Sequence, residues 1–70
     1  MSSEFQITLN GEPYAVSGDE RLIALIEGLK LKRGRVAVEI NRVIVPKDEW
    51  ERTMIAPGDV VEIVNFVGGG

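Results

Sequence analysis

Histidine and cysteine are both absent from the 70-residue sequence. Without them, the chain cannot carry thiol nucleophiles, histidine-based catalytic dyads or triads, the usual zinc sites or disulfide bridges. Small secreted domains commonly depend on disulfides, so the lack of cysteine also argues against a secreted scaffold. These absences point away from an autonomous enzyme and toward a cytoplasmic domain that binds no metal.

Long apolar runs and an excess of positive charge are also missing. No uninterrupted apolar stretch approaches the length of a membrane span, and residues Met1–Glu4 lack the basic region of a signal peptide. Eight basic and eleven acidic residues give a net charge of -3, which opposes binding to the phosphates of DNA or RNA. We therefore expect neither a membrane nor a nucleic-acid partner.

The composition that remains is that of a small globular domain, with 44% apolar and 27% charged residues. A chain of 70 residues has room for one core only. A domain of this size has a stability of about 3–5 kcal/mol and no space for a deep active-site cavity.

The first residues alternate in polarity, as the residues of a half-buried strand do. One face carries the apolar side chains of Phe5, Ile7 and Leu9. The dipeptide Asn10-Gly11 follows and favours the two-residue type I′ turn, in which both central residues adopt positive φ. Residues 14–16 are interpreted as the returning strand, so the chain is predicted to open with a β-hairpin.

Residues 20–31 carry the spacing of an amphipathic helix. The apolar side chains that recur on one face are Leu22, Leu25, Ile26 and Leu29. Ser17 or Asp19 is the expected acceptor for the free N–H groups at the helix start, and Gly28 is expected to loosen the last turn. The basic cluster in residues 30–35 is interpreted as a solvated helix end, where cations complement the helix dipole.

The second half of the chain predicts three further strands, over residues 36–40, 43–45 and 60–67. Asn41-Arg42 marks the tight turn between the first two of them. Residues 46–52 are predicted to form a single helical turn or loop, in which Trp50 closes the core rather than stacking on a ligand.

The predicted order of elements is two strands, a helix, two strands, a short turn and a final strand. This order is typical of the β-grasp arrangement, an α+β fold in which the first and last strands lie parallel at the centre. We therefore predict a ubiquitin-like mixed sheet of about five strands with one main helix on one face. The predicted domain covers residues 1–66, and a flexible glycine tail covers residues 67–70.

The last predicted strand carries apolar side chains on both faces. If Val61 and Ile63 point into the core, then Val60, Val64 and Phe66 point outward, which is unfavourable on a solvated face and suggests a surface for a partner. The alternative is that neighbouring side chains partly cover them.

The three terminal glycines Gly68, Gly69 and Gly70 have no side chains to pack and cannot contribute to stability. A chain end without side chains can pass through a narrow channel and place its carboxylate against the catalytic groups of an enzyme. A carboxylate becomes reactive once ATP adenylates it, yet the chain contains no phosphate-loop motif. The chain is therefore interpreted as a substrate and carrier that binds no cofactor itself.

Several motifs of the second half resemble one known family. They are Val38-Glu39-Ile40-Asn41, Ile44-Val45-Pro46-Lys47, Trp50, Pro57-Gly58-Asp59, Val61-Glu62-Ile63-Val64 and Val67-Gly68-Gly69-Gly70. With them the chain resembles the ubiquitin-like sulfur carrier proteins, and within these the ThiS family of thiamine biosynthesis, from Ile7 to Gly70. The small subunit of molybdopterin synthase shares the fold and the Gly-Gly end, but it is usually longer and lacks the Val-Pro…Trp segment.

The resemblance implies that an E1-like adenylyltransferase of the ThiF type, which uses MgATP, adenylates the carboxylate of Gly70. Sulfur that comes ultimately from a cysteine desulfurase would convert it to a thiocarboxylate, and a thiazole synthase of the ThiG type would take that sulfur. Gly69 and Gly70 match the reactive tail of the family, whose common motif is two glycines, and Gly68 extends it. Val60, Val64, Phe66 and Val67 are the candidate docking residues.

Two other functions stay open at this point. The chain could carry sulfur for another pathway, such as a molybdopterin or tungsten cofactor or tRNA thiolation. It could also be a β-grasp interaction domain or a protein modifier without sulfur chemistry. Arg21 departs from the family pattern, because relatives often have a small hydroxyl residue at the helix start.

Overall fold

The computed structural model describes residues 4–66, which contain five strands, one α-helix and two short 3-10 turns. The elements are β1 Glu4–Leu9, β2 Glu12–Ser17, α1 Leu22–Gly28, η1 Arg33–Arg35, β3 Val36–Ile40, β4 Val43–Ile44, η2 Lys47–Glu49 and β5 Val60–Asn65. Their order is the predicted one. The predicted last strand extends to residue 67, whereas β5 ends at Asn65, and Val67 lies outside the described residues.

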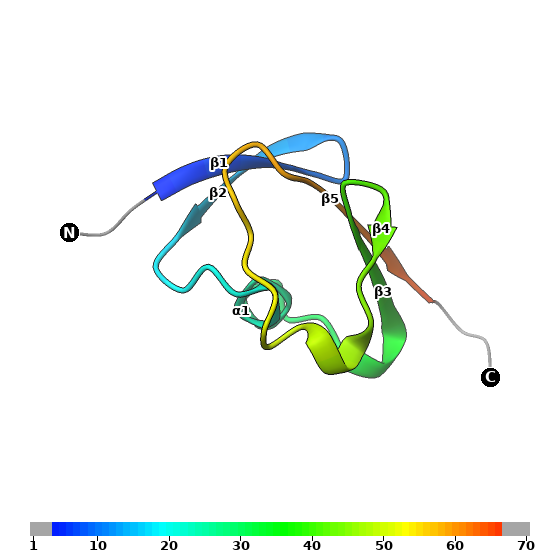
Figure 1. Ribbon diagram of the computed structural model, residues 1–70. Coiled ribbons are helices and arrows are strands. Elements are labelled where there is room, and N and C mark those ends of the chain that lie inside the picture. Colours follow the sequence, from blue (N-terminus) through cyan, green and yellow to red (C-terminus); the bar gives the residue numbers. More distant parts are fainter. Residues whose placement is uncertain (1–3, 67–70) are drawn as a thin grey trace.

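The five strands form one mixed sheet in the order β2-β1-β5-β3-β4. β1 and β5 are parallel, and the other neighbours are antiparallel. Figure 1 shows α1 on one side of this curved sheet, with β5 running between β1 and β3. The predicted β-grasp arrangement, with the last strand in the centre, is therefore confirmed.

Both predicted hairpin turns are formed by residues in the left-handed region. Asn10 and Gly11 have φ of 50° and 84°, and Asn41 and Arg42 have φ of 53° and 71°. Positive φ at two successive positions is what a type I′ turn requires, and asparagine tolerates it better than most residues. Arg42 has no such tolerance, so the second turn is the less favourable of the two.

The core lies between α1 and the inner face of the sheet. Its buried apolar residues are Ile7, Val16, Leu22, Ile23, Leu25, Ile26, Val36, Val38, Trp50, Ile55 and Val61. Trp50 is 0% exposed, and its indole N–H donates to the carbonyl oxygen of Val45 at 3.0 Å. The prediction that Trp50 closes the core is therefore confirmed.

The helix is shorter than predicted. It begins at Leu22 and ends at Gly28, whereas the sequence pattern predicted residues 20–31. Lys30 follows with φ of 60°, its N–H donates to the carbonyl of Glu27 at 3.0 Å, and the N–H of Leu31 donates to that of Ile26 at 3.3 Å. This pair of bonds is the Schellman motif, which ends a helix by turning the chain through a left-handed residue.

The apolar spacing continues past this end because Leu29 and Leu31 still pack against the core. The apolar spacing after Gly28 therefore marks buried residues that follow the helix, and not further helical residues. No basic residue lies in the last turn of α1, so the prediction that the cluster in residues 30–35 complements the helix dipole is wrong.

The predicted cap at the helix start is also wrong. Arg21 is the N-cap residue, and no side chain caps the helix. The first N–H groups, of Leu22 and Ile23, instead donate to the main-chain carbonyls of Thr53 at 2.8 Å and Trp50 at 3.1 Å. A segment far along the chain thus satisfies donors that usually require a side-chain acceptor.

Candidate functional site

β5 presents a strip of exposed apolar side chains on the face of the sheet that α1 does not cover. Val61 is buried and Ile63 is half-buried on the inner face. Val60, Val64 and Phe66 are 41%, 56% and 56% exposed. The predicted outward orientation of Val60 and Val64 is confirmed. Phe66 lies beyond the end of β5 and lines a hollow with Lys30 and Leu31, which follow α1. We call Val60, Val64 and Phe66 the β5 strip.

Neighbouring side chains cover this strip only in part, as the alternative allowed, and about half of it stays exposed. On the adjacent strands, Thr8 lies opposite Val60 and Ala37 lies opposite Val64. Both of these neighbours are small side chains. More than half of the Val64 side chain therefore stays in contact with solvent, which is unusual for an apolar residue on a central strand.

Sequence reasoning missed a further apolar residue on this face. Ile44 of β4 pairs with Glu39 of β3, which pairs with Glu62 of β5, and directly opposed residues point to the same side of a sheet. Ile44 is 68% exposed, and the adjacent Val43 is 64% exposed. The sequence signal for this exposed pair was a run of β-branched residues in a short predicted strand, because so short a strand contacts little of the core.

Two asparagines of the hairpin turns hold β5 in place from both sides, and sequence reasoning missed both roles. The side-chain oxygen of Asn10 accepts the N–H of Ile63 at 2.8 Å. The side-chain oxygen of Asn41 accepts the N–H of Val60 at 2.9 Å, and its amide donates to a carboxylate oxygen of Asp59 at 3.0 Å. The turn dipeptides were visible in the sequence, but their distant acceptors and donors were not.

The tail itself, including Val67, Gly68, Gly69 and Gly70, lies outside the described residues. The last described residue, Phe66, is anchored next to β3, because its N–H donates to the carbonyl oxygen of Arg35 at 2.7 Å. The chain therefore leaves the sheet beside β3, at the opposite end of β5 from the Asn41 contact.

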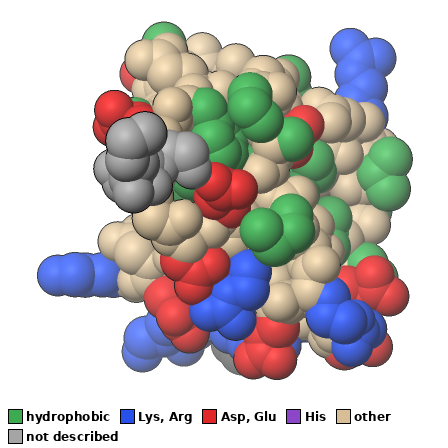
Figure 2. All heavy atoms as spheres, turned by 60° about the vertical axis from the view of Figure 1, so that its left-hand side comes forward, with side chains coloured by type: hydrophobic (Ala, Val, Ile, Leu, Met, Phe, Trp, Pro, Cys, Tyr) green, Lys and Arg blue, Asp and Glu red, His purple; other side chains and the backbone are tan. Residues whose placement is uncertain are grey.

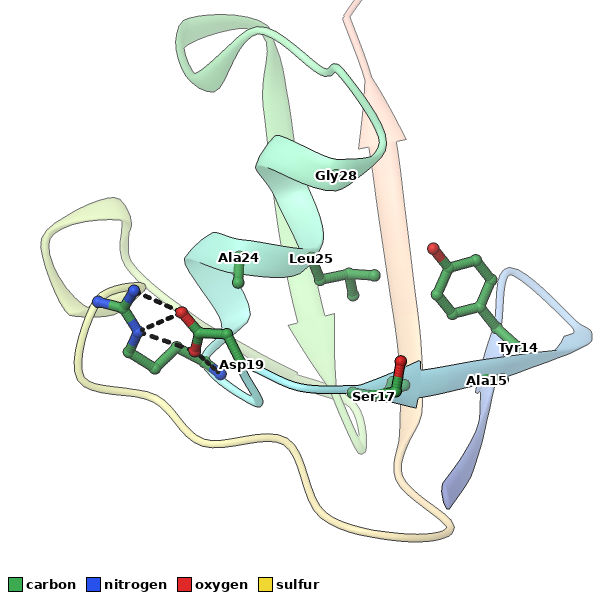
Figure 3. Close-up of a pocket in the computed structure, with 9 residues that line it drawn as sticks. Tyr14, Ala15, Ser17, Asp19, Ala24, Leu25 and Gly28 are labelled. Carbon is green, nitrogen blue, oxygen red and sulfur yellow. Dashed lines mark hydrogen bonds and ion pairs between the residues drawn. The ribbon is translucent and has the colours of Figure 1, made fainter. Parts of the chain in front are cut away.

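The described surface shows no arrangement of catalytic groups. A hollow between β2 and α1 is lined by Tyr14, Ser17 and Asp19 together with Leu25 and Gly28 of the helix (Figure 3). Residues 4–66 contain no group of three histidine, cysteine, aspartate or glutamate side chains that could hold a metal ion. No helix in that part of the chain is long and apolar enough to cross a membrane.

One perturbed carboxylate lies in that hollow. Asp19 receives hydrogen bonds from the Arg21 side chain, the shortest at 2.6 Å, and from the Arg21 backbone N–H at 3.1 Å. These bonds lower the pKa of Asp19 to about 2. Asp19 therefore forms a surface ion pair with Arg21 and lacks the raised pKa of a general acid.

Figure 2 shows charged side chains of both signs crowded over one half of the face it presents, with hydrophobic side chains in small separate groups.

The fold defines a small β-grasp protein, one of whose sheet faces carries exposed apolar side chains. The ThiS family model matches residues 7–70. The chain therefore belongs to the ThiS family, as its resemblance to sulfur carriers predicted.

Similar proteins agree with this assignment. The crystal structure of a thiamine biosynthesis protein (ThiS) from Geobacter metallireducens is similar with a TM-score of 0.79 and 33% sequence identity, over 94% of this chain and 100% of that chain. The "Sulfur carrier protein ThiS" of Bacillus subtilis is 35% identical over 65 residues, which are 91% of this chain and 98% of the relative. The name of the Bacillus subtilis relative is that of a carrier and not of an enzyme.

A third relative is much longer. The "Thiazole synthase" of Magnetococcus marinus is 35% identical over 65 residues, or 93% of this chain but 20% of the relative. The chain thus spans about a fifth of the length of that protein. A ThiS-like segment and the remainder of a protein named thiazole synthase occur there in one polypeptide.

Proposed function

We propose that this chain carries sulfur in thiamine biosynthesis as a thiocarboxylate on Gly70. The observation that carries the proposal is the family match, which runs from residue 7 to residue 70 and so includes all three terminal glycines. The central position of β5 supports it, because the chain that reaches the glycines continues from a strand with neighbours on both sides.

The proposed chemistry takes place in partner enzymes. The Gly70 carboxylate attacks the α-phosphorus of MgATP held by an E1-like adenylyltransferase of the ThiF type, and pyrophosphate leaves. A persulfide sulfur supplied through a cysteine desulfurase then attacks the carbonyl carbon, and AMP leaves. A thiol finally breaks the sulfur–sulfur bond, which leaves a thiocarboxylate on Gly70 and a disulfide on the donor side.

We propose a thiazole synthase of the ThiG type as the acceptor of this sulfur. The support is the Magnetococcus marinus relative, in which a segment similar to this chain is part of a protein of that name. Two domains in one polypeptide have a high effective concentration relative to each other, which favours their association.

The β5 strip and Val67 are the proposed docking residues, and Gly68, Gly69 and Gly70 are the proposed channel segment. The exposure of Val60, Val64 and Phe66 supports the first assignment, because burying exposed apolar surface favours association. Glycines suit the second because a side chain at these positions would widen the segment that enters the partner.

The test is the intact mass of the chain after incubation with the adenylyltransferase and cysteine desulfurase of the same organism, MgATP and cysteine. The expected result is a gain equal to exchanging one oxygen atom for one sulfur atom at Gly70. The matched control lacks Gly70 and should show no gain and no ATP–pyrophosphate exchange. Normal exchange with the truncated chain would contradict the proposal.

A second control guards against inactive partners. The same enzymes should be assayed with the carrier that they are known to modify. An unchanged mass of this chain alongside a modified control carrier would move its function to a β-grasp binding module, and covalent conjugates in cell extracts would indicate a protein modifier.

A further inference from the structure

The positive charge of this acidic protein is concentrated at one place. Residues 30–35 hold four of the eight basic residues and no acidic residue. The rest of the chain holds four basic and eleven acidic residues, a balance of 4 − 11 = −7. Such a separation creates a local positive field that an overall net charge of -3 conceals.

The side chains of three of these four basic residues form no ion pair within the described part of the chain. Arg33 donates to the carbonyl oxygen of Lys47 at 2.8 Å and lies 5.6 Å from the centre of the Trp50 ring. The other three are exposed and form no ion pair among residues 4–66. These three are Lys30, Lys32 and Arg35. Together with Leu31, Asn65 and Phe66, they line a hollow that we call the basic crevice.

Lys30 occupies a backbone position where glycine is usual. It is the left-handed residue of the Schellman motif that ends α1, with φ of 60°. Glycine adopts this conformation without a steric penalty, whereas a side chain brings Cβ too close to the backbone. Local stability would favour glycine, and no contact of the lysine ammonium within residues 4–66 compensates for the penalty.

The crevice lies where the chain leaves the sheet. Phe66 lines the crevice, and its N–H donates to the carbonyl oxygen of Arg35 at 2.7 Å. Gly70 is four positions after Phe66 along the chain, and four residues span at most about 14 Å when fully extended. An enzyme that acts on the Gly70 carboxylate therefore has to come within about 14 Å of the crevice.

We propose that the basic crevice binds an acidic segment of the adenylyltransferase, beside the channel that receives the tail. This inference rests on the proposed function and names the chemistry of the partner surface. Leu31 and Phe66 offer apolar contact area, while Lys30, Lys32 and Arg35 are covered in the complex. Covering unpaired cations is costly, so the partner surface must supply carboxylates there.

The test compares matched variants in ATP–pyrophosphate exchange, with kcat/KM measured for the chain as substrate. Lys32→Glu/Arg35→Glu should lower kcat/KM about tenfold at low salt. Arg42→Glu/Arg52→Glu makes the same change in net charge elsewhere, since Arg42 lies at the far end of β3 and Arg52 follows η2. This control should change kcat/KM less than about twofold.

Lys30→Gly separates the partner contact from folding. Its urea unfolding midpoint should rise, because glycine relieves the left-handed strain, while its kcat/KM should fall about threefold through loss of one interface charge. Rising salt should reduce the kcat/KM of the unmodified chain more than that of Lys32→Glu/Arg35→Glu.

The results can tell this inference apart from the proposed function. If the unmodified chain supports no exchange with active enzyme, the proposed function and this inference both fail. If it supports exchange but both double variants behave alike, the inference alone is overturned. An effect confined to the KM for ATP would also overturn it, because the crevice would then bind nucleotide phosphates.

Discussion

Asn41 should be one of the few exposed residues whose loss strongly destabilises the domain. Its φ of 53° lies in the left-handed region. Its side chain makes two hydrogen bonds, one that accepts from the N–H of Val60 at 2.9 Å and one that donates to Asp59 at 3.0 Å. Both bonds attach the β3–β4 turn to the beginning of β5.

The cost can be divided between hydrogen bonds and backbone conformation. Each intramolecular hydrogen bond contributes about 0.5–1.5 kcal/mol, so loss of both should cost Asn41→Gly about 1–3 kcal/mol. Asn41→Ala loses the same bonds and also forces alanine into the left-handed region, which adds about 1 kcal/mol. Asn41→Ala should therefore remove about 2–4 kcal/mol of the roughly 3–5 kcal/mol available to a domain of this size.

The assay is urea unfolding followed by the fluorescence of Trp50, the single tryptophan, which is 0% exposed in the folded chain. Asn65→Ala is the matched control, because Asn65 is exposed and its side chain makes no hydrogen bond within the described residues. It should change stability by less than about 0.5 kcal/mol. An Asn41→Ala midpoint equal to that of the control would show that the two hydrogen bonds do not stabilise the domain. Equal losses for Asn41→Gly and Asn41→Ala would show that the left-handed φ imposes no cost on alanine.

Three further outcomes are expected from single substitutions. Trp50→Phe should cost about 2–3 kcal/mol in thermal unfolding, because it leaves a cavity and removes the donor to the Val45 carbonyl; a cost under 1 kcal/mol would contradict this. Asp19 has a folded pKa lowered to about 2, chiefly by the side-chain hydrogen bond from Arg21, so its contribution to stability is present above about pH 4 and lost as pH falls toward 2. Asp19→Asn should therefore weaken the dependence of the unfolding midpoint on pH between those values. An unchanged pH dependence in this variant would count against the ion pair. Val64→Lys, at a side chain 56% exposed, should alter stability by less than about 0.5 kcal/mol yet lower kcat/KM for adenylation, and an unaffected kcat/KM would remove Val64 from the docking surface.

Features that depend on neighbouring residues in the chain were predictable. Alternation placed the strands and the outward side of Val64, Asn10-Gly11 indicated positive φ, and Asn41-Arg42 indicated a second tight turn. These predictions succeeded because side-chain period and turn geometry are set within a few residues. The ThiS-like motifs and the terminal glycines likewise required no structure to be recognised.

The two misses at the helix have different causes. The helix start was predicted to use Ser17 or Asp19, but the main chain of Thr53 and Trp50, which are distant in the sequence, satisfies the first N–H groups of α1. The helix end was predicted at residue 31, but the Schellman turn at Lys30 ends it earlier, with hydrogen bonds to nearby carbonyls. The apolar spacing extended past that turn because Leu29 and Leu31 still pack against the core.

The amino-acid order alone was sufficient for the class of fold, the exposed apolar strip and the glycine end that the family shares. Folding was needed to bring Lys30, Lys32 and Arg35 against Phe66, and to join the side chains of Asn10 and Asn41 to β5. The physical reason is range. Strand period and turn conformation are short-range properties of the backbone, whereas a crevice or a cross-strand hydrogen bond exists only after distant segments have packed together.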